Sequence, residues 1–401
     1  MRCISFIKIF MQKKCSRLDL ALIDCQFSQS KPFGFRNYEI NGLLGKFKNA
    51  KAYAMFPMAP DKKAWFRHGY GVKKKEFKKN LEGYLTHYPE NKNKIAYLPK
   101  RLQNVGVTYC CFLAQAYVLL PYLNKNKLPF VFVLYPGGAF GLNNASSDAM
   151  LAEIFKSPYF RKVIVTQPAT KDYLLQKKLC SVDKIEYLFG GYLQFSLDDV
   201  KPKKKYPDDK KTLDICFVAA RYSPFGMDKG YDLFIETGKA LIAKYPFVRL
   251  HVVGDFDPTD IDVSTISDKI TFYGFQTPEF LKDFYPSMDI CLLPNRPFKL
   301  YQGNFDGFPL GCEAMIFGSV LMTTDELDNN QGTFMDGQEL IIIKPEAQDI
   351  LQKIMPLIEK PEKLYQIGHK GQVKIVQVMD PVQRLDKVAH ILSDEIKGGL
   401  N

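Results

Sequence analysis

The most informative stretch of the sequence is Phe305-Asp306-Gly307-Phe308-Pro309-Leu310-Gly311-Cys312-Glu313-Ala314-Met315. It places two carboxylates, Asp306 and Glu313, seven residues apart around a Gly-Phe-Pro turn that leads into an apolar helix. The start of a helix presents backbone N–H groups without partners and the positive end of the helix dipole, which suits a phosphate. Carboxylates at the two edges of the turn can accept hydrogen bonds from sugar hydroxyls. The stretch therefore indicates a site for a nucleotide sugar.

The same stretch resembles the donor-site motif of glycosyltransferase family 4, a group of retaining enzymes with the two-domain GT-B fold. The family motif has two glutamates separated by seven residues, with Gly-Phe-Pro after the first and Ala-Met after the second. Residues 307–309 (Gly-Phe-Pro) and 313–315 (Glu-Ala-Met) match it, and Gly318 matches the glycine that follows. The chain departs from the motif in two ways, because Asp306 replaces the first glutamate and the spacing is one residue shorter.

The resemblance implies a set of site residues. Arg221 and Lys229 follow a strand and would hold the donor diphosphate, while Glu313 would bind ribose hydroxyls. Asp306 would contact the donor sugar, and Tyr135 would lie on the acceptor side. The other implied donor-binding residues are Gly307, Phe308, Pro309, Leu310, Gly274, Phe275, Asp255, Gly137 and Gly138. No metal and no cofactor are implied.

Plainer roles are open for the same residues. Arg221 and Lys229 can be surface cations, and Asp306 can be an ordinary turn aspartate. Glu313 can stabilise the helix dipole from the first turn. Residues 135–141 (Tyr-Pro-Gly-Gly-Ala-Phe-Gly) can be a tight strand-to-helix turn, and they do not match a dinucleotide fingerprint because Pro136 stands at the first required glycine.

Length and charge favour two domains with different surroundings. A chain of 401 residues exceeds what one core usually serves. Its 46% hydrophobic and 24% charged residues are typical of a globular protein. Residues 1–211 carry a net charge of +21, whereas residues 212–401 carry −9. This asymmetry indicates that the first half faces an anionic surface, either nucleic acid or an acidic membrane leaflet.

The nine cysteines show no CxxC or Cys/His metal pattern. Their odd number and spacing favour reduced thiols in the cytoplasm over a disulfide framework or a zinc site. The apolar start, Met1 to Met11, contains Arg2 and Lys8 and is too short for a bilayer span, which needs about 20 apolar residues. The longest apolar run, Tyr109 to Leu123, favours a buried crossover helix, so no membrane-spanning segment is expected.

Strand-like and helical runs alternate along the whole chain, which predicts parallel α/β layers. In the first half, strands are expected at Leu20–Asp24, Lys51–Phe56, Lys94–Leu98, Phe130–Leu134 and Lys162–Thr166. In the second half, strands are expected at Leu213–Ala219, Arg249–Val253, Ile270–Phe272, Ile290–Leu293, Val320–Thr323 and Leu340–Lys344. Helices are expected at Tyr231–Tyr245, at Pro278–Tyr285 and after the 305–311 turn.

These patterns and the resemblance predict a GT-B fold, in which two Rossmann-like doubly wound domains face each other across a cleft. Residues 1–197 would form the acceptor-side domain and residues 212–378 the nucleotide-sugar domain. The lysine-dense segment 198–211 would be a basic linker. Residues 379–401, with a helix over Pro381–Lys397, would cross back to the first domain.

Asp255-Phe256-Asp257 has the Asp-x-Asp spacing with which some transferases hold Mn²⁺ or Mg²⁺. Because it follows a strand at the family's Gly-Asp turn, a turn beside the nucleotide is the favoured interpretation. The five histidines show neither a ligand spacing nor a nucleophile–base pattern. We therefore predict a metal-independent reaction.

A basic segment, residues 62–79, interleaves lysines and one arginine with Trp65, Phe66, Tyr70 and Phe77. Such a surface can bind anionic lipid headgroups or single-stranded nucleic acid, or it can be a solvated lysine-rich face without a ligand. Membrane contact is the preferred functional interpretation, because a glycan-assembling enzyme commonly meets a lipid-linked acceptor. The expected location is the cytoplasm, with contact at the inner face of the plasma membrane.

The resulting hypothesis is a retaining glycosyltransferase that moves a sugar from a UDP- or GDP-sugar to a glycan or lipid-linked acceptor. Synthesis of surface polysaccharide or lipopolysaccharide is the expected setting. Two alternatives stay open, which are a non-catalytic GT-B partner subunit and a nucleic-acid-binding α/β protein. The acidic second half disfavours nucleic acid, so none is expected as a partner.

Overall fold

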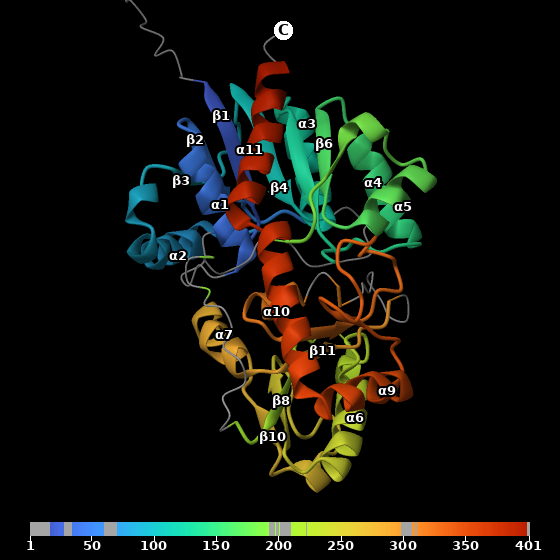
Figure 1. Ribbon diagram of the computed structural model, residues 1–401. Coiled ribbons are helices and arrows are strands. Elements are labelled where there is room, and N and C mark those ends of the chain that lie inside the picture. Colours follow the sequence, from blue (N-terminus) through green and yellow to red (C-terminus); the bar gives the residue numbers. More distant parts are fainter. Residues whose placement is uncertain are drawn as a thin grey trace, which may run out of the picture.

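The computed structural model describes residues 17–27, 34–59, 70–191, 197, 200, 210–221, 223–297, 307–308 and 311–398. They form two domains, each built around one sheet with helices packed against it (Figure 1). All strand pairs in both sheets are parallel. The predicted fold class, two doubly wound α/β domains, is confirmed.

The first sheet has seven strands in the order β3-β2-β1-β4-β5-β6-β7. Its central strand β5 is buried at every residue, which explains why Phe-Val-Phe-Val-Leu shows no alternation of polar and apolar residues. The strands are β1 (Leu18–Asp24), β2 (Ala50–Ala54), β3 (Ile95–Tyr97), β4 (Val105–Cys111), β5 (Phe130–Leu134), β6 (Phe160–Val165) and β7 (Ile185–Tyr187).

Helices cover both faces of the first sheet. One face packs against α1 (Phe35–Lys46), α2 (Lys74–His87) and α11 (Pro381–Gly398), and the other against α3 (Leu113–Asn126), α4 (Ala145–Phe155) and α5 (Pro168–Gln176). The short 3-10 turns η1 (Pro89–Asn91) and η2 (Val182–Lys184) precede β3 and β7. The last helix, α11, thus packs on the first domain although it follows the second in sequence (Figure 1).

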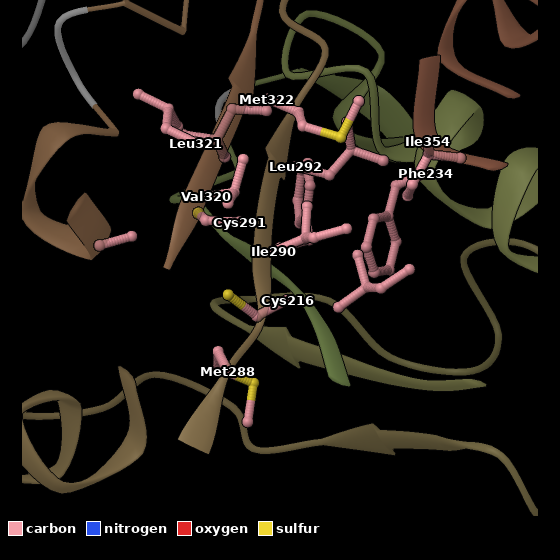
Figure 2. Close-up of a cluster of buried hydrophobic side chains, with 14 of the residues drawn as sticks. Cys216, Phe234, Met288, Ile290, Cys291, Leu292, Val320, Leu321, Met322 and Ile354 are labelled. Carbon is pink, nitrogen blue, oxygen red and sulfur yellow. The ribbon is translucent and has the colours of Figure 1, made fainter. Parts of the chain in front are cut away.

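The second sheet has six strands in the order β10-β9-β8-β11-β12-β13. They are β8 (Leu213–Val218), β9 (Val248–Val253), β10 (Ile270–Phe272), β11 (Ile290–Leu293), β12 (Val320–Thr323) and β13 (Ile341–Ile342). The associated helices are α6 (Tyr231–Lys244), α7 (Pro278–Phe284), α8 (Cys312–Ile316), α9 (Ala347–Ile358) and α10 (Pro361–Val378), with 3-10 turns η4 (Pro224–Gly226), η5 (Ser264–Ile266) and η6 (Tyr285–Ser287). Figure 2 shows the core they share, in which side chains of β8, β11 and β12 meet Phe234 of α6 and Ile354 of α9.

The expected helix from Tyr109 to Leu123 is wrong in its first part. Val105–Cys111 is strand β4, and helix α3 begins at Leu113, immediately after it. The chain changes from strand to helix at a single residue, Phe112, whose φ is 65°. No glycine or proline marks this boundary, and periodicity does not distinguish a buried strand from a buried helix. Strand β7 was not expected either, since it has only three residues.

The chain passes between the domains at two places that lie against each other. Leu188 packs on the first core and the next residue, Phe189, on the second. The Arg384 guanidinium, at the start of α11, donates hydrogen bonds to both of their carbonyl oxygens, at 3.0 and 2.7 Å. The Arg384 side chain therefore joins the segment that leaves the first domain to the segment that returns to it.

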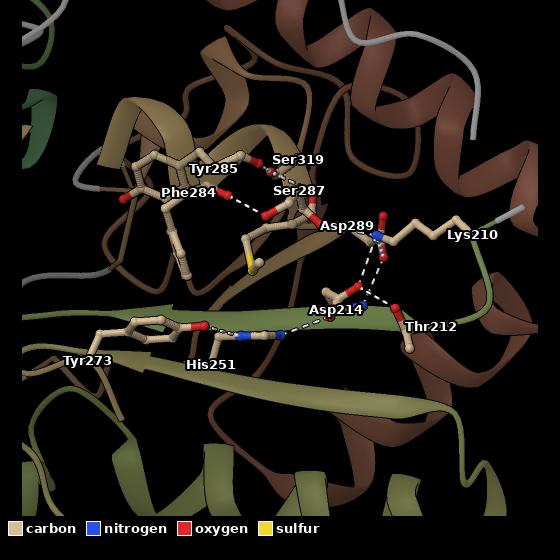
Figure 3. A network of polar contacts seen from close by, with 11 residues as sticks. Lys210, Thr212, Asp214, His251, Tyr273, Phe284, Tyr285, Ser287, Asp289 and Ser319 are labelled. Atoms are coloured by element: carbon tan, nitrogen blue, oxygen red, sulfur yellow. Dashed lines mark hydrogen bonds and ion pairs between the residues drawn. The ribbon is translucent and has the colours of Figure 1, made fainter. Parts of the chain in front are cut away.

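A polar network lies at the amino ends of β8 and β11, where the chain enters the second domain (Figure 3). Asp214 Oδ1 lies 2.8 Å from His251 Nε2, and Lys210 Nζ lies 3.0 Å from Asp214 Oδ2. Lys210 Nζ also lies 2.6 Å from Asp289 Oδ2. Because ligands of parallel sheets bind at the carboxyl ends of the strands, we assign this network to stability.

We expect Asp214 to make the second domain sensitive to acid. Burial alone would raise the pKa of Asp214, but hydrogen bonds from His251 and Lys210 lower it to about 2. Since the unfolded value is about 3.9, this stabilisation is complete above pH ~4 and is lost as the pH falls towards 2. Asp214→Asn should therefore lower the melting temperature at pH 7, with the difference from wild type shrinking between pH 4 and 2.

The matched control is Asp268→Asn, because the Asp268 side chain is exposed and, within the described part of the chain, forms an ion pair only with its neighbour Lys269. That variant should melt like the wild type at every pH. A difference for Asp214→Asn that stays constant from pH 7 to pH 2 would contradict the assignment.

Candidate functional site

The strand order of the second sheet reverses between β8 and β11, which are neighbours in the sheet but not in sequence. In parallel sheets, ligands bind beyond the carboxyl ends of the strands at such a point. Three segments meet there: the loop 219–230 after β8, residues 294–296 after β11, and Thr324 after β12. The site is built from these segments and the 307–311 turn.

Lys229 lies at the end of the first of these segments, next to the start of α6. Gly230 follows with φ of 72°, and a Cβ atom there would lie 2.1 Å from the carbonyl oxygen of Pro294. Only glycine allows this approach. The close contact holds Lys229 beside the end of β11. Burial lowers the pKa of Lys229, and the nearby Asp228 carboxylate opposes that shift.

Arg296 braces the loop that carries Lys229. Its guanidinium makes two hydrogen bonds to the Asp232 carboxylate, at 2.6 and 2.7 Å, and a third to the Met227 carbonyl at 2.9 Å. Its backbone N–H donates to the carbonyl of Asp228 at 3.0 Å. Arg296 was not predicted from the sequence, although an arginine three residues after a fully buried strand could have signalled it.

The 307–311 turn is joined to the same edge. The Gly307 N–H lies 3.4 Å from Thr324 Oγ1, and that hydroxyl donates to the carbonyl of Asn295 at 3.0 Å. A Cβ atom on Gly307 would lie 2.7 Å from the carbonyl oxygen of Leu293, so this position also needs glycine. Thr324 was not singled out from the sequence, because nothing local distinguishes it from other threonines after strands.

The Phe308 side chain is fully buried, so it packs rather than lining an open surface. Its ring lies 5.7 Å from that of Phe334 and 5.6 Å from that of Phe189, measured between centroids. Phe189 belongs to the connection between the domains. The turn therefore rests on an aromatic contact with that connection, and a donor contact of Phe308 stays a prediction.

Glu313 lies in the first turn of α8 and is half-buried. This helix has only five residues, so its dipole is smaller than the sequence suggested. Burial and the nearby Glu313 carboxylate raise the pKa of the Cys312 thiol, which therefore stays protonated. The role of Glu313 towards ribose hydroxyls stays a prediction.

Arg221 is exposed three residues after β8 and forms an ion pair with Asp260. Asp260 also accepts a hydrogen bond from the N–H of Asp257, at 3.0 Å, which places the cation over the 255–260 loop. The Gly254 N–H donates to the carbonyl of Gly274, at 2.9 Å. The structure thus brings Arg221, Asp255 and Gly274 to neighbouring loops of the same sheet edge.

Phe275, beside Gly274, is 76% exposed, which is unusual for a phenylalanine and leaves its ring available. Asp257 accepts hydrogen bonds from the N–H and hydroxyl of Thr259, and these bonds lower its pKa. Its carboxylate therefore stabilises a turn. Across the described part of the chain, no group of three or more His, Cys, Asp or Glu side chains could hold a metal ion.

Three predicted residues lie in the first domain, after β5. Gly137 and Gly138 have φ of 80° and 54°, and Gly138 lies against the Phe112 ring. Tyr135 is only 5% exposed, between the rings of Phe35 and Phe112, and burial raises its pKa far above the usual range. An acceptor contact of Tyr135 stays a prediction, and this conformation buries the phenol in the core.

A cavity of about 180 Å³ lies at the reversal point of the first sheet, after β1 and at the start of α1. Its polar lining includes Asp24 and Arg36, which form an ion pair, and Gln26, whose Oε1 lies 3.0 Å from Arg36 Nη1. No local pattern in the sequence predicts this cavity. Its walls come from residues whose partners are distant in sequence, such as Gln115 beside Arg36.

Several predicted residues lie outside the described part of the structure. They include Asp306, Pro309 and Leu310 of the donor motif, most of the expected linker, and Trp65 and Phe66 of the basic segment. Within the described part of that segment, five lysines at the start of α2 are exposed: Lys73, Lys74, Lys75, Lys78 and Lys79. No helix of the described chain is both long and apolar enough to cross a membrane.

Comparisons with known proteins agree with this geometry. Residues 213–360 match the family described as glycosyl transferases group 1. Similar solved structures include a sucrose-phosphate synthase from Thermosynechococcus elongatus, with a TM-score of 0.64 and 15% sequence identity over 95% of this chain and 100% of that one. No curated protein sequence matches the chain significantly.

Two further structures have the same architecture. Anabaena HepE in complex with UDP-glucose has a TM-score of 0.65 and 15% identity over 94% of this chain and 99% of that one. A glycosyltransferase from Rickettsia africae has a TM-score of 0.63 and 13% identity over 95% and 99% of the two chains. At these identities the likeness concerns the fold.

The fold is therefore GT-B, with two parallel-sheet domains and a site at the carboxyl edge of the second sheet. Residues 213–360, which make up most of the second domain, are similar to the group 1 glycosyl transferases. The predicted resemblance is confirmed at this level. Membership of family 4 in particular stays a prediction.

Proposed function

We propose that the protein transfers a sugar from a nucleotide-sugar donor with retention of configuration. One observation carries the proposal: Lys229 and the 307–311 turn share the carboxyl edge of the second sheet, connected through Pro294, Asn295 and Thr324. A cation and a glycine turn at a strand-order reversal suit a diphosphate. The complex of Anabaena HepE with UDP-glucose supports a UDP-sugar as donor.

In the proposed reaction, an acceptor hydroxyl attacks the anomeric carbon while the diphosphate leaves. Lys229 and Arg221 would stabilise the charge that develops on the leaving group. Glu313 would hold the ribose, and the 307–311 turn would orient the diphosphate. Oxygen atoms of the leaving diphosphate would assist removal of the acceptor proton, so the reaction needs neither a protein base nor a metal ion.

The acceptor would bind in the first domain, where the cavity beside Asp24 and Arg36 lies at the reversal point of the sheet. We propose a glycan or lipid-linked acceptor in surface polysaccharide or lipopolysaccharide synthesis, at the inner face of the plasma membrane. The exposed lysines at the start of α2 support contact with anionic headgroups.

A non-catalytic GT-B partner subunit is a second candidate, favoured by the altered spacing between Asp306 and Glu313. Hydrolysis of a nucleotide sugar by the purified protein distinguishes the two, because a non-catalytic subunit can bind a nucleotide but does not cleave its sugar bond.

The first test is a thermal-shift panel of nucleoside diphosphates and their sugar conjugates. A ligand present at a hundred times its dissociation constant stabilises the folded protein by about 2.7 kcal/mol. We expect UDP-glucose or GDP-mannose to raise the melting temperature, and Lys229→Ala to reduce that rise. The proposal would be wrong if no nucleotide or nucleotide sugar at millimolar concentration raised the melting temperature of the wild type.

A further inference from the structure

The two domains meet at the start of helix α5. Strand β6 ends at Val165, and Gln167 is the N-cap of α5. The loop after β12 in the second domain lies opposite, because the Ala169 N–H donates a hydrogen bond to Asn329 Oδ1 at 3.3 Å. This bond joins residues that are 160 positions apart in sequence.

Three buried side chains at this junction have polar atoms without hydrogen-bond partners in the described structure: Gln167, Thr170 and Asn329. They are 1%, 1% and 0% exposed. The atoms without partners are the amide oxygen and the amide nitrogen of Gln167, the hydroxyl of Thr170 and Nδ2 of Asn329. Because burying a polar atom without a partner is unfavourable, such a cluster needs an explanation.

The loop that carries Asn329 is held next to the donor motif. Thr324, at its start, contacts Gly307, and Asp325 accepts a hydrogen bond from the Asn329 N–H at 2.7 Å. Asn330 fixes the other side of the loop through two 2.8 Å hydrogen bonds with the backbone of Phe334. Asn329 is therefore one short loop away from the turn proposed to orient the donor.

The chemistry of the cluster selects among ligands. The Gln167 amide, the Asn329 amide nitrogen and the Thr170 hydroxyl offer both hydrogen-bond donors and acceptors, and none of them is charged. Such a set suits a ligand that carries hydroxyl groups. Burial raises the pKa of Asp325 to about 6, so its carboxylate is mostly ionised at pH 7 and disfavours an anion beside Asn329. An apolar ligand would leave the polar atoms unpaired.

We propose that Gln167, Thr170 and Asn329 form a subsite for the hydroxyl groups of the transferred sugar, built from both domains. The proposal rests on the proposed function, since it assigns the sugar of the same nucleotide-sugar donor. The sugar would take up the hydrogen bonds that these side chains lack and would lie between α5 and the 324–335 loop.

The test compares melting temperatures with UDP-glucose against UDP, and in parallel with GDP-mannose against GDP. In the wild type, the nucleotide sugar should raise the melting temperature more than the nucleotide alone. Thr170→Val and Gln167→Met remove hydrogen-bonding atoms at nearly constant size. We expect each to weaken binding of the nucleotide sugar about tenfold and to leave nucleotide binding unchanged, as loss of one neutral hydrogen bond predicts.

Two matched controls accompany these variants. Thr170→Ser keeps the hydroxyl and should keep the preference for the nucleotide sugar. Thr108→Val removes another buried, unpartnered threonine hydroxyl, but in the middle of β4, and should leave that preference unchanged.

The unliganded proteins give a second readout. Removing an unpartnered hydroxyl should leave the melting temperature of Thr170→Val equal to or above that of the wild type. A clear drop would mean that the hydroxyl serves the unliganded fold, which would overturn the subsite. An unchanged preference for the nucleotide sugar in Thr170→Val and Gln167→Met would also overturn it. If no nucleotide binds the wild type, the proposed function fails, and that result is distinct from either of these.

Discussion

Replacing Lys229 by alanine is expected to lower the rate of sugar transfer about 10²-fold. Removing one group that stabilises the charge of the transition state has an effect of this size in other enzymes. Lys229 is held beside Pro294 by the close approach of Gly230, and Arg296 braces the loop around it. The cation therefore has a defined position at the edge of the second sheet. The same change at Arg221 is expected to have a similar effect, although the Asp260 ion pair leaves Arg221 at the surface.

Hydrolysis or transfer of the nucleotide sugar identified by the thermal-shift panel measures this effect. Lys239→Ala is the matched control, because Lys239 lies on the same helix α6 and bonds only the carbonyl of Asp262 among the described side-chain contacts. It should retain wild-type turnover. Near-normal turnover of both Lys229→Ala and Arg221→Ala would refute the assignment of the diphosphate site.

The second large effect concerns stability. Phe308→Ala removes a fully buried ring from the contact with Phe334 and Phe189. Large-to-small changes of this kind lower the free energy of unfolding by about 3–5 kcal/mol, because apolar burial is lost and a cavity is left. Since Phe308 follows Gly307, the change should also loosen the donor turn. We expect a melting temperature lower by about 10 °C and weaker binding of the nucleotide.

Phe247→Ala serves as the control, because Phe247 lies in the same domain and is 43% exposed. Its loss should change stability by less than about 0.5 kcal/mol. If Phe308→Ala melted like Phe247→Ala, the aromatic contact between the donor turn and the domain connection would have no energetic role.

Much of the architecture followed from the sequence. Strands β5, β10, β11 and β12 were expected with the bounds that they have. Of these strands, β5, β11 and β12 are buried at every residue. Such strands are short apolar runs bounded by polar or turn residues, and they can be recognised in the sequence without knowledge of the strands beside them. The prediction failed between β4 and α3, where two buried elements adjoin and Phe112 alone separates them.

The candidate site divides in the same way. Glycines that let backbone segments approach, a cation after a strand and an acid at a helix start are local patterns, so Lys229, Gly307 and Glu313 could be selected from the sequence. Arg296, Thr324 and the cavity beside Arg36 could not. Their importance comes from hydrogen bonds to partners such as Asp232, Asn295 and Gln115, and no local sequence pattern predicts those hydrogen bonds.

The sequence by itself thus determined two parallel α/β domains and the edge of the second sheet at which a diphosphate is expected, because hydrophobic periodicity and turn chemistry act over a few residues. Only the tertiary structure placed Phe189 against Phe308, Arg384 on the connection between the domains, and Gln167 and Thr170 near Asn329. These contacts join segments more than a hundred residues apart, and they form only when two separate cores pack against each other.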